Sequence, residues 1–249
     1  MELSVSNAVA RTLRSILYRI GYRMVRLDRP FDFEAFLHLA LKEKGELFFV
    51  QIGACDGVSS DPIHRFVRRN HDRVAGLVVE PLDDHFEALQ RNYAPYPAVV
   101  PVRVAIHNSE KQMTLHRVDP RKLGTLPKWA RGISSFDKDH HKRSGTPSGV
   151  MIEETVPCQT LDEVLEEQAV RNVDVLVIDT EGYDAEILHG IDFMRFKPKI
   201  IRFEHGLSSA VISRETFSGV VDLLHRNGYE LALERFDATA YQRDLVLGG

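Results

Sequence analysis

The chain has 249 residues, of which 43% are hydrophobic and 27% charged, and its formal net charge at pH 7 is -4. This composition is ordinary for a soluble globular protein of one domain or slightly more, and the charge gives no support for general nucleic-acid binding. Two cysteines are too few for a disulfide framework, and no apolar run approaches the roughly 20 residues that span a bilayer, so we expect a cytoplasmic protein.

The first residues of the chain predict a basic amphipathic helix. Between Leu3 and Leu27 there are five arginines and no acidic residue, and apolar residues recur at helical spacing. Two interpretations stay open. The helix lies on a partner or on an anionic membrane, which would place the protein at the inner face of the membrane, or it caps the domain or pairs two protomers. We therefore divide the chain into an N-terminal helical extension, residues 1–44, and a main domain, residues 45–249.

From residue 31 onward the chain alternates predicted helices and strands. Helices are expected at residues 31–44, 62–70, 83–93, 160–168, 183–188 and 217–227. Strands are expected at residues 47–52, 76–80, 99–106, 108–118, 173–178, 200–203, 229–236 and 241–247. Because right-handed crossovers join strands that a helix separates, this order predicts an α/β fold with a doubly wound, mostly parallel sheet. The last two strands have no helix between them and predict a C-terminal antiparallel pair.

Residues 119–155 are the least regular part of the chain. They hold glycines, prolines, the only tryptophan (Trp129) and a polar run at residues 140–145. Long excursions of this kind are often lids or binding loops, so we expect a lid over the acceptor site here. A solvated surface loop without function is the alternative.

A buried strand at residues 47–52 runs into a turn bounded by Gly53 and Gly57. Glycine lets the backbone approach a ligand closely, so we expect Gly53, Ala54 and Gly57 beside a nucleotide-like cofactor. The pattern is Gly-x-x-x-Gly, not the Gly-x-Gly-x-x-Gly of dinucleotide sites, and it favours S-adenosylmethionine (SAM). Cys55, inside the turn, is expected to be a small packing residue.

Two acids accompany this turn. Asp56 pairs with the amino group of the ligand in one interpretation and caps the following helix in the other. Asp61 precedes Pro62 at the start of a predicted helix, and it too is either a ligand contact or a plain N-cap.

The ends of the next two strands predict the other cofactor contacts. Glu80, followed by Pro81, ends the second strand, and an acid there accepts two hydrogen bonds from a ribose. Ala105, Ile106 and Asn108 end the third strand, where an adenine ring would lie in this architecture. We therefore predict all five as cofactor-binding residues.

Acids also gather at the ends of two later strands. Asp179 and Glu181 follow one strand, and Glu204 and His205 end the next. Grouped carboxylates raise one another's pKa, and a carboxylate with a raised pKa can take a proton from an alcohol. His205 is an alternative base. We predict these four residues as catalytic, while the same acids could hold a divalent cation that binds a diol; a metal site is not part of the prediction.

In this order the motifs resemble the FkbM-type SAM-dependent methyltransferases. The matching segments, spread over roughly residues 45–235, are 49–57 with Asp61-Pro62, 79–81, 160–162, 178–184 and 202–205. The resemblance implies a class I methyltransferase fold, SAM as the cofactor, and O-methylation of a natural product or a sugar hydroxyl. It also implies SAM contacts from Gly53, Asp56 and Glu80, and a methyl-transfer site around Asp179, Glu181 and Glu204. Two positions depart from the pattern: Gln51 replaces an acid that many methyltransferases have, and Val177 replaces a lysine that many relatives have.

The sequence thus favours an enzyme that moves a methyl group from SAM to a hydroxyl of a small molecule or glycan. A non-catalytic module that binds SAM or a nucleotide on the same fold is the alternative. A nucleotide-binding dehydrogenase is a third hypothesis, against which the glycine pattern and the terminal antiparallel strands count.

Overall fold

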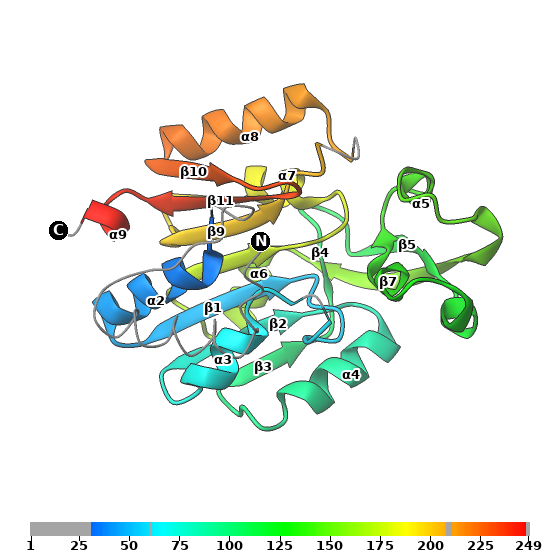
Figure 1. The fold of residues 1–249 in the computed structure, drawn as a ribbon, viewed down its shortest axis with the longest axis horizontal. Helices are drawn as coiled ribbons and strands as arrows, with labels where there is room; N and C mark the ends of the chain where they lie inside the picture. The colour runs from blue at the N-terminus through cyan, green and yellow to red at the C-terminus, as the bar shows by residue number, and fades with distance from the viewer. Residues whose placement is uncertain (1–30, 60, 208–210, 248–249) are drawn as a thin grey trace, which may run out of the picture. The chain divides into compact units, whose positions relative to one another are not determined.

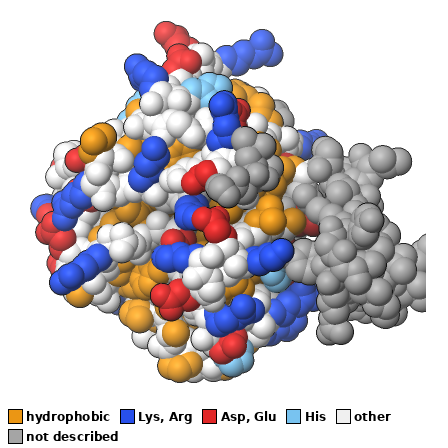
Figure 2. All heavy atoms as spheres, turned by 90° about the vertical axis from the view of Figure 1, so that its left-hand side faces the viewer, with side chains coloured by type: hydrophobic (Ala, Val, Ile, Leu, Met, Phe, Trp, Pro, Cys, Tyr) orange, Lys and Arg blue, Asp and Glu red, His pale blue; other side chains and the backbone are white. Residues whose placement is uncertain are grey.

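The computed structural model describes residues 31–59, 61–207 and 211–247. The predicted basic helix of the first residues lies outside these ranges, so its membrane or partner contact stays a prediction. Residues from Phe33 onward form one compact unit. No helix in the described ranges is long and apolar enough to cross a membrane. On the described part of the face in Figure 2, basic and acidic side chains are interspersed, which fits the small net charge.

A seven-stranded sheet forms the centre of this unit (Figure 1). Its strands are β1 (Leu47–Ile52), β2 (Val74–Val79), β3 (Val99–Val102), β8 (Val175–Ile178), β9 (Ile200–Glu204), β10 (Tyr229–Leu233) and β11 (Asp237–Gln242). Their order is β10-β11-β9-β8-β1-β2-β3, parallel from β9 to β3 and antiparallel at β11 and β10. The predicted doubly wound, Rossmann-like sheet with a C-terminal antiparallel pair is confirmed.

The order of the strands reverses between β1 and β8. The chain runs from β1 outward to β2 and β3, then returns to the other side of β1 as β8 and β9. In doubly wound sheets the carboxyl ends of the strands at such a reversal leave a crevice in which ligands bind. The sheet topology therefore points to the ends of β1 and β8 before any side chain is considered.

Helices cover both faces of the sheet. They are α2 (Phe33–Lys44), α3 (His64–Asn70), α4 (Asp83–Tyr93), α6 (Leu161–Glu167), α7 (Asp184–His189) and α8 (Arg214–Arg226). On one face Val50 and Leu176 of the strands share a core cluster with Val164 of α6, Leu188 of α7 and Leu224 of α8. Val50 and Leu176 are fully buried, and their packing holds the ends of β1 and β8 in place.

The opposite face lies under α2 and α3. The ring of His38 in α2 lies 5.0 Å from the ring of Phe66 in α3, and the guanidinium of Arg202 in β9 lies 5.0 Å over the ring of Phe33. The amine of Lys44 donates to both carboxylate oxygens of Asp174 at 2.8 Å, at the start of β8. Helix α2 therefore packs with the sheet as part of the same unit.

A second, four-stranded sheet departs from the sequence prediction. Its strands are β4 (Ala105–Ile106), β5 (Gln112–Val118), β6 (Ser134–Ser135) and β7 (Met151–Gln159), in the order β4-β7-β5-β6. The strand predicted at residues 99–106 is thus two strands in two sheets. Pairing with β2 stops after the amide of Glu80 donates to the carbonyl of Val102, because the next residue, Pro81, has no N–H.

The predicted excursion is more regular than expected. Residues 119–155 contain 3-10 helices at Pro120–Thr125, Lys128–Gly132 and Ser148–Val150, the short helix α5 (His140–Arg143), β6 and the first residues of β7. Strand β7 pairs with β5 from Met151 to Pro157. The segment projects beyond the carboxyl ends of the parallel strands (Figure 1).

Two boundaries near the C-terminus also differ from the prediction. Residues 241–247 were expected to be a strand, but β11 ends at Gln242 and α9 (Asp244–Leu247) follows. Helix α8 begins at Arg214, earlier than residue 217, because the hydroxyl of Ser213 accepts the amide N–H of Thr216 at 2.9 Å and caps it.

Candidate functional site

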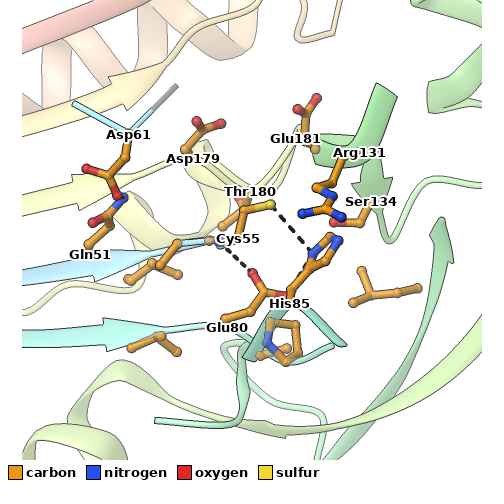
Figure 3. Close-up of a pocket in the computed structure, with 18 of the residues that line it drawn as sticks. Gln51, Cys55, Asp61, Glu80, His85, Arg131, Ser134, Asp179, Thr180 and Glu181 are labelled. Carbon is orange, nitrogen blue, oxygen red and sulfur yellow. Dashed lines mark hydrogen bonds and ion pairs between the residues drawn. The ribbon is translucent and has the colours of Figure 1, made fainter. Parts of the chain in front are cut away.

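A cavity of about 280 Å³ lies at the carboxyl ends of β1, β2 and β8 (Figure 3). Predicted site residues that line it are Gly53, Ala54, Asp61, Glu80, Pro81, Ala105, Ile106, Asp179 and Glu181. Predicted site residues that do not line it are Asp56, Gly57, Asn108, Glu204 and His205. The excursion contributes a further edge, from Lys128 to Phe136.

The turn after β1 holds an unusual backbone. Gly53 has φ +79°, and a Cβ placed there would lie 1.8 Å from the carbonyl oxygen of Asp179 at the end of β8. Glycine is thus required where the two central strand ends touch. Cys55 has φ +48°, in a region that non-glycine residues rarely adopt and that tends to occur at functional sites. Its backbone N–H points to Glu80 as a result.

Glu80 is a buried carboxylate at the end of β2. Its Oε2 accepts the N–H of Cys55 at 2.9 Å and its Oε1 accepts the N–H of Leu82 at 3.0 Å. The Nδ1 atom of His85 lies 3.7 Å from Oε1 of Glu80 and 3.7 Å from the sulfur of Cys55. Burial disfavours the charged form of His85, but its contacts with Cys55 and Glu80 outweigh this and raise its pKa to about 10. The protonated imidazole of His85 therefore lies beside the carboxylate of Glu80.

The two other acids near the first turn are held by local donors. The carboxylate of Asp56 accepts the N–H groups of Val58 and Ser59 and the hydroxyl of Ser59, which outweigh burial and lower its pKa. These bonds close a turn at which no helix begins, so Asp56 is not a helix cap, and it does not line the cavity. Gly57 is required for packing, because a Cβ there would lie 2.5 Å from Leu89.

Asp61 does line the cavity. Its Oδ1 accepts the N–H groups of Ile63 and His64 before α3, and its Oδ2 accepts the amide of Gln51 at 2.9 Å. Burial raises the pKa of Asp61 even though these hydrogen bonds oppose the shift. Asp61 is therefore both a helix cap and a cavity wall.

The residues predicted at the end of the third strand differ in whether they line the cavity. Ala105 and Ile106 line the cavity, whereas the side chain of Asn108 donates to the backbone carbonyl of Glu186 at 2.6 Å and lies outside it. Asn108 thus ties the second sheet to α7.

The loop after β8 is fixed from several sides. The buried carboxylate of Asp184 accepts the N–H and hydroxyl of Thr180 and, at 2.9 Å, the N–H of Glu204. Burial raises the pKa of Asp184 to about 6. Glu181 has φ +54°, the same uncommon region as Cys55. Its backbone carbonyl accepts the hydroxyl of Ser135 at 2.7 Å.

The side chain of Glu181 is held by the excursion. Its Oε2 lies 2.8 Å from Nε2 of His140, a buried residue of α5. His140 was not singled out from the sequence, where it is one residue of an exposed-looking polar run. The predicted lid region therefore orients a cavity residue.

The acids at the ends of β8 and β9 lack donors. The carboxylates of Asp179 and Glu204 accept no hydrogen bond from the described residues, and Oε2 of Glu204 is buried without a partner. Burial, followed by repulsion from Glu181, Asp184 and Asp237, raises the pKa of Glu204 to about 8. Asp179 has surface open to the cavity but protein on its other sides. Burial and the neighbouring carboxylates raise its pKa well above the usual range.

His205 has a structural position. Its Nε2 lies 3.1 Å from the backbone carbonyl of Glu234, and its Nδ1 accepts the N–H of Leu207 at 3.2 Å. Both ring nitrogens are thus engaged, with the proton on Nε2.

Several cavity residues match the needs of a bound SAM. Gln51 is 2% exposed and lines the cavity, and its Oε1 has no partner, so it can accept an N–H from a ligand. Glu80 lines the cavity and retains acceptor lone pairs beyond its two backbone bonds. In the described ranges no group of three or more His, Cys, Asp or Glu side chains is arranged to hold a metal ion.

The family model described as Methyltransferase FkbM domain matches residues 51–231. Among curated proteins no match was found. Similar solved structures include an O-methyltransferase from Bacillus cereus in complex with SAH (9% identity, 96% of this chain and 93% of that chain, TM-score 0.43). They also include Aeropyrum pernix fibrillarin with bound S-adenosyl-L-methionine (14% identity, 84% and 75%, TM-score 0.39). A third is a Methanococcus jannaschii fibrillarin pre-rRNA processing protein (15% identity, 79% and 66%, TM-score 0.42).

Proposed function

Because this chain belongs to the FkbM family of SAM-dependent methyltransferases, we propose that it transfers the methyl group of SAM to a hydroxyl oxygen of a small molecule, a sugar of a glycan or a natural product. The observation that carries the choice of oxygen is the pair of acids without hydrogen-bond donors, Asp179 and Glu204, at the ends of adjacent strands. A hydroxyl is a poor nucleophile until its proton is removed, and a carboxylate with a raised pKa is suited to remove it.

The first half of the cavity would hold the methyl donor. Glu80 is oriented by the backbone N–H groups of Cys55 and Leu82, so its remaining lone pairs can accept ribose hydroxyls. The unpartnered Oε1 of Gln51 would accept a hydrogen bond from the amino group. When bound, SAM supplies a methyl group on a positively charged sulfur that is already a good leaving group.

The second half would receive the acceptor. Asp179 lines the cavity, and Glu204 lies level with it, since β8 and β9 pair in register one residue earlier at Ile178 and Phe203. Asp179 would take the hydroxyl proton as the oxygen attacks. Glu204 does not line the cavity; its repulsion adds to burial and to the larger repulsion from Glu181 and Asp184, which together raise the pKa of Asp179.

Calorimetry with SAM, and NAD as the control ligand, tests the donor. We expect binding of SAM in the micromolar range and none of NAD. Absence of SAM binding in well-folded protein would support a non-catalytic module that binds another nucleotide.

Methyl transfer from isotope-labelled SAM to a set of sugars, sugar phosphates and uronic acids tests the base. We expect Asp179→Asn to lower the rate by about 10²–10⁴-fold and to change the Kd for SAM by less than about threefold. Asp72→Asn, a substitution of an exposed acid far along the chain from both strand ends, is the matched control. A variant that keeps the wild-type rate would contradict the role of Asp179, and a protein that binds SAM but methylates nothing would support the module.

A further inference from the structure

One edge of the cavity carries the opposite charge to the acids described so far. It is formed by the 3-10 helix Lys128–Gly132, in which Ala130 is 1% exposed and anchors the turn. The residues on either side of this anchor, Lys128, Trp129 and Arg131, are exposed and line the cavity. We refer to these three residues as the cationic edge.

The cationic edge is fixed relative to the acids. Shortly after it, the hydroxyl of Ser135 donates to the carbonyl of Glu181. The ring of Phe136 lies 5.3 Å from that of Tyr183 and 5.7 Å from that of His107, both at nearly right angles. The edge therefore sits across the cavity as a packed wall, and Figure 3 shows Arg131 beside Glu181 and above His85.

The two cations of the edge keep hydrogen-bond donors that could bind a ligand. Lys128 forms no hydrogen bond or ion pair within the described residues. Arg131 forms an ion pair with Asp56 at 3.6 Å, which is too long for a hydrogen bond, and the oxygens of Asp56 already accept from Val58 and Ser59. The guanidinium thus keeps its donors for a planar anion.

Trp129 adds an apolar surface to the same edge. Its side chain is 55% exposed although the ring is the largest apolar group at the cavity. An exposed tryptophan beside a cavity offers a flat face to the C–H groups of a ring, and its neighbouring cations supply charge recognition.

We propose that the cationic edge is the acceptor-binding site and that the acceptor is a sugar bearing an anionic group, a phosphate or a carboxylate. This rests on the proposed function. Lys128 and Arg131 bind the anionic group, Trp129 packs against the sugar ring, and a hydroxyl of the sugar lies toward Asp179. Repulsion from the carboxylates of Asp179 and Glu181 excludes the reversed orientation, so the two charged sides of the cavity together set which hydroxyl reacts.

The single tryptophan of the chain makes this testable by fluorescence. Full-length protein saturated with S-adenosylhomocysteine is titrated with glucose 1-phosphate, glucuronate and glucose while Trp129 emission is recorded. We expect a change in emission with at least one anionic sugar at a Kd at least tenfold below that of glucose. The phosphate and the carboxylate arms tell which anion is recognised.

Charge variants separate this inference from the function on which it rests. We expect the double variant Lys128→Gln with Arg131→Gln to lose the tenfold preference and to bind S-adenosylhomocysteine within about twofold of wild type. Lys138→Gln, an exposed lysine of the same excursion outside the cavity lining, should keep the preference.

Three results would overturn the inference: no emission change with either anionic sugar, equal affinity for glucose, or a double variant that loses S-adenosylhomocysteine binding instead of sugar preference. The last result would assign the cations to the donor. Failure of the proposed function differs from all three, because wild-type protein would then either not bind S-adenosylhomocysteine or bind SAM and methylate no acceptor.

Discussion

Carboxylates at two pairs of strand ends, in or near the cavity, have opposite surroundings. At the ends of β1 and β2, Asp56 accepts three hydrogen bonds and Glu80 two, all from donors within the same turns. At the ends of β8 and β9, Asp179 and Glu204 accept none from the described residues and face other carboxylates. The same functional group is thus stabilised as an anion at one end and destabilised as an anion at the other.

Carboxylates with different surroundings are therefore suited to different roles. A carboxylate that donors hold in place is a fixed binding group, whereas one without donors gains most from a proton. Asp61 is intermediate, because it accepts three hydrogen bonds and is still raised in pKa by burial. Residue type and strand position alone therefore do not identify which acid acts as a base.

The largest effect is expected where the two ends touch. Gly53→Ala places a Cβ 1.8 Å from the carbonyl oxygen of Asp179, and it also strains the backbone at φ +79°. We expect the free energy of unfolding, measured with urea, to fall by about 3–5 kcal/mol. Gly45→Ala is the control, since φ there is +87° but no atom lies within 4 Å, so only the strain of about 1–2 kcal/mol remains. Equal losses in the two variants would mean that the contact between β1 and β8 adds nothing.

The next effect concerns the donor-rich end. Glu80→Gln removes an acceptor for one backbone N–H and the charge that faces protonated His85. We expect a loss of about 2–4 kcal/mol in unfolding free energy and a 10–100-fold weaker SAM affinity. A double-mutant cycle with His85→Leu checks the cause, because the stability loss from Glu80→Gln should shrink when no imidazolium remains. An additive cycle would show that the imidazolium does not depend on Glu80.

A smaller effect of opposite sign is expected at the donor-poor end. The pKa of Glu204 in the folded protein, about 8, lies above the ordinary glutamate value of 4.5, so the folded state binds the proton more tightly. Its contribution is present below pH 4.5 and is lost as pH rises through about 8. We expect Glu204→Gln to increase unfolding free energy on the order of 1–3 kcal/mol at pH 9 and to change it little at pH 4.

Urea unfolding at the two pH values measures this change. Glu46→Gln, at an exposed acid that forms no hydrogen bond or ion pair in the described residues, should show no such pH dependence. A Glu204→Gln variant that is less stable than wild type at pH 9 would contradict the idea that this carboxylate is strained as an anion.

The smallest effect should arise at the excursion. Ser135→Ala removes the hydrogen bond to the carbonyl of Glu181 and the acceptor for the N–H of Asp137, and it should lower unfolding free energy by about 1 kcal/mol. Ser134→Ala, a neighbouring substitution without a side-chain hydrogen bond in the described residues, should have less effect. Thermal unfolding of both variants measures the difference, and equal midpoints would remove Ser135 as a support of the loop.

The seven-stranded sheet could be predicted from the sequence because the patterns that indicate its strands and helices each lie within a few residues. The buried runs of β1 and β8 and the capping box of α6, in which Thr160 and Glu163 bond reciprocally, lie within a few residues. The second sheet could not be predicted, because β7 pairs with β5 across the excursion and only two residues of β7, Val156 and Cys158, are buried. Long-range pairing is not encoded in a local pattern.

The site was predictable to the level of strand ends. The acids that follow β1, β2, β8 and β9 do gather at one edge of the sheet, but the direction of each side chain was not accessible. His85 was not among the predicted site residues, yet it is 3% exposed beside Glu80. Arg131 is in a segment without periodicity, so its place at the cavity could not be predicted. Only the structure shows that it lies near Asp56 and Glu181.

The position of β11 in the sheet bears on the synthesis of the protein. Although β11 follows β10 in the chain, it lies between β10 and β9, where Ala238 and Ala240 are fully buried. Until residues 237–242 have left the ribosome, β9 is an uncovered edge strand and Glu204 lies on it. The strands that carry the donor-rich end are translated far earlier, so the binding end can be assembled on the nascent chain before the acidic end is complete.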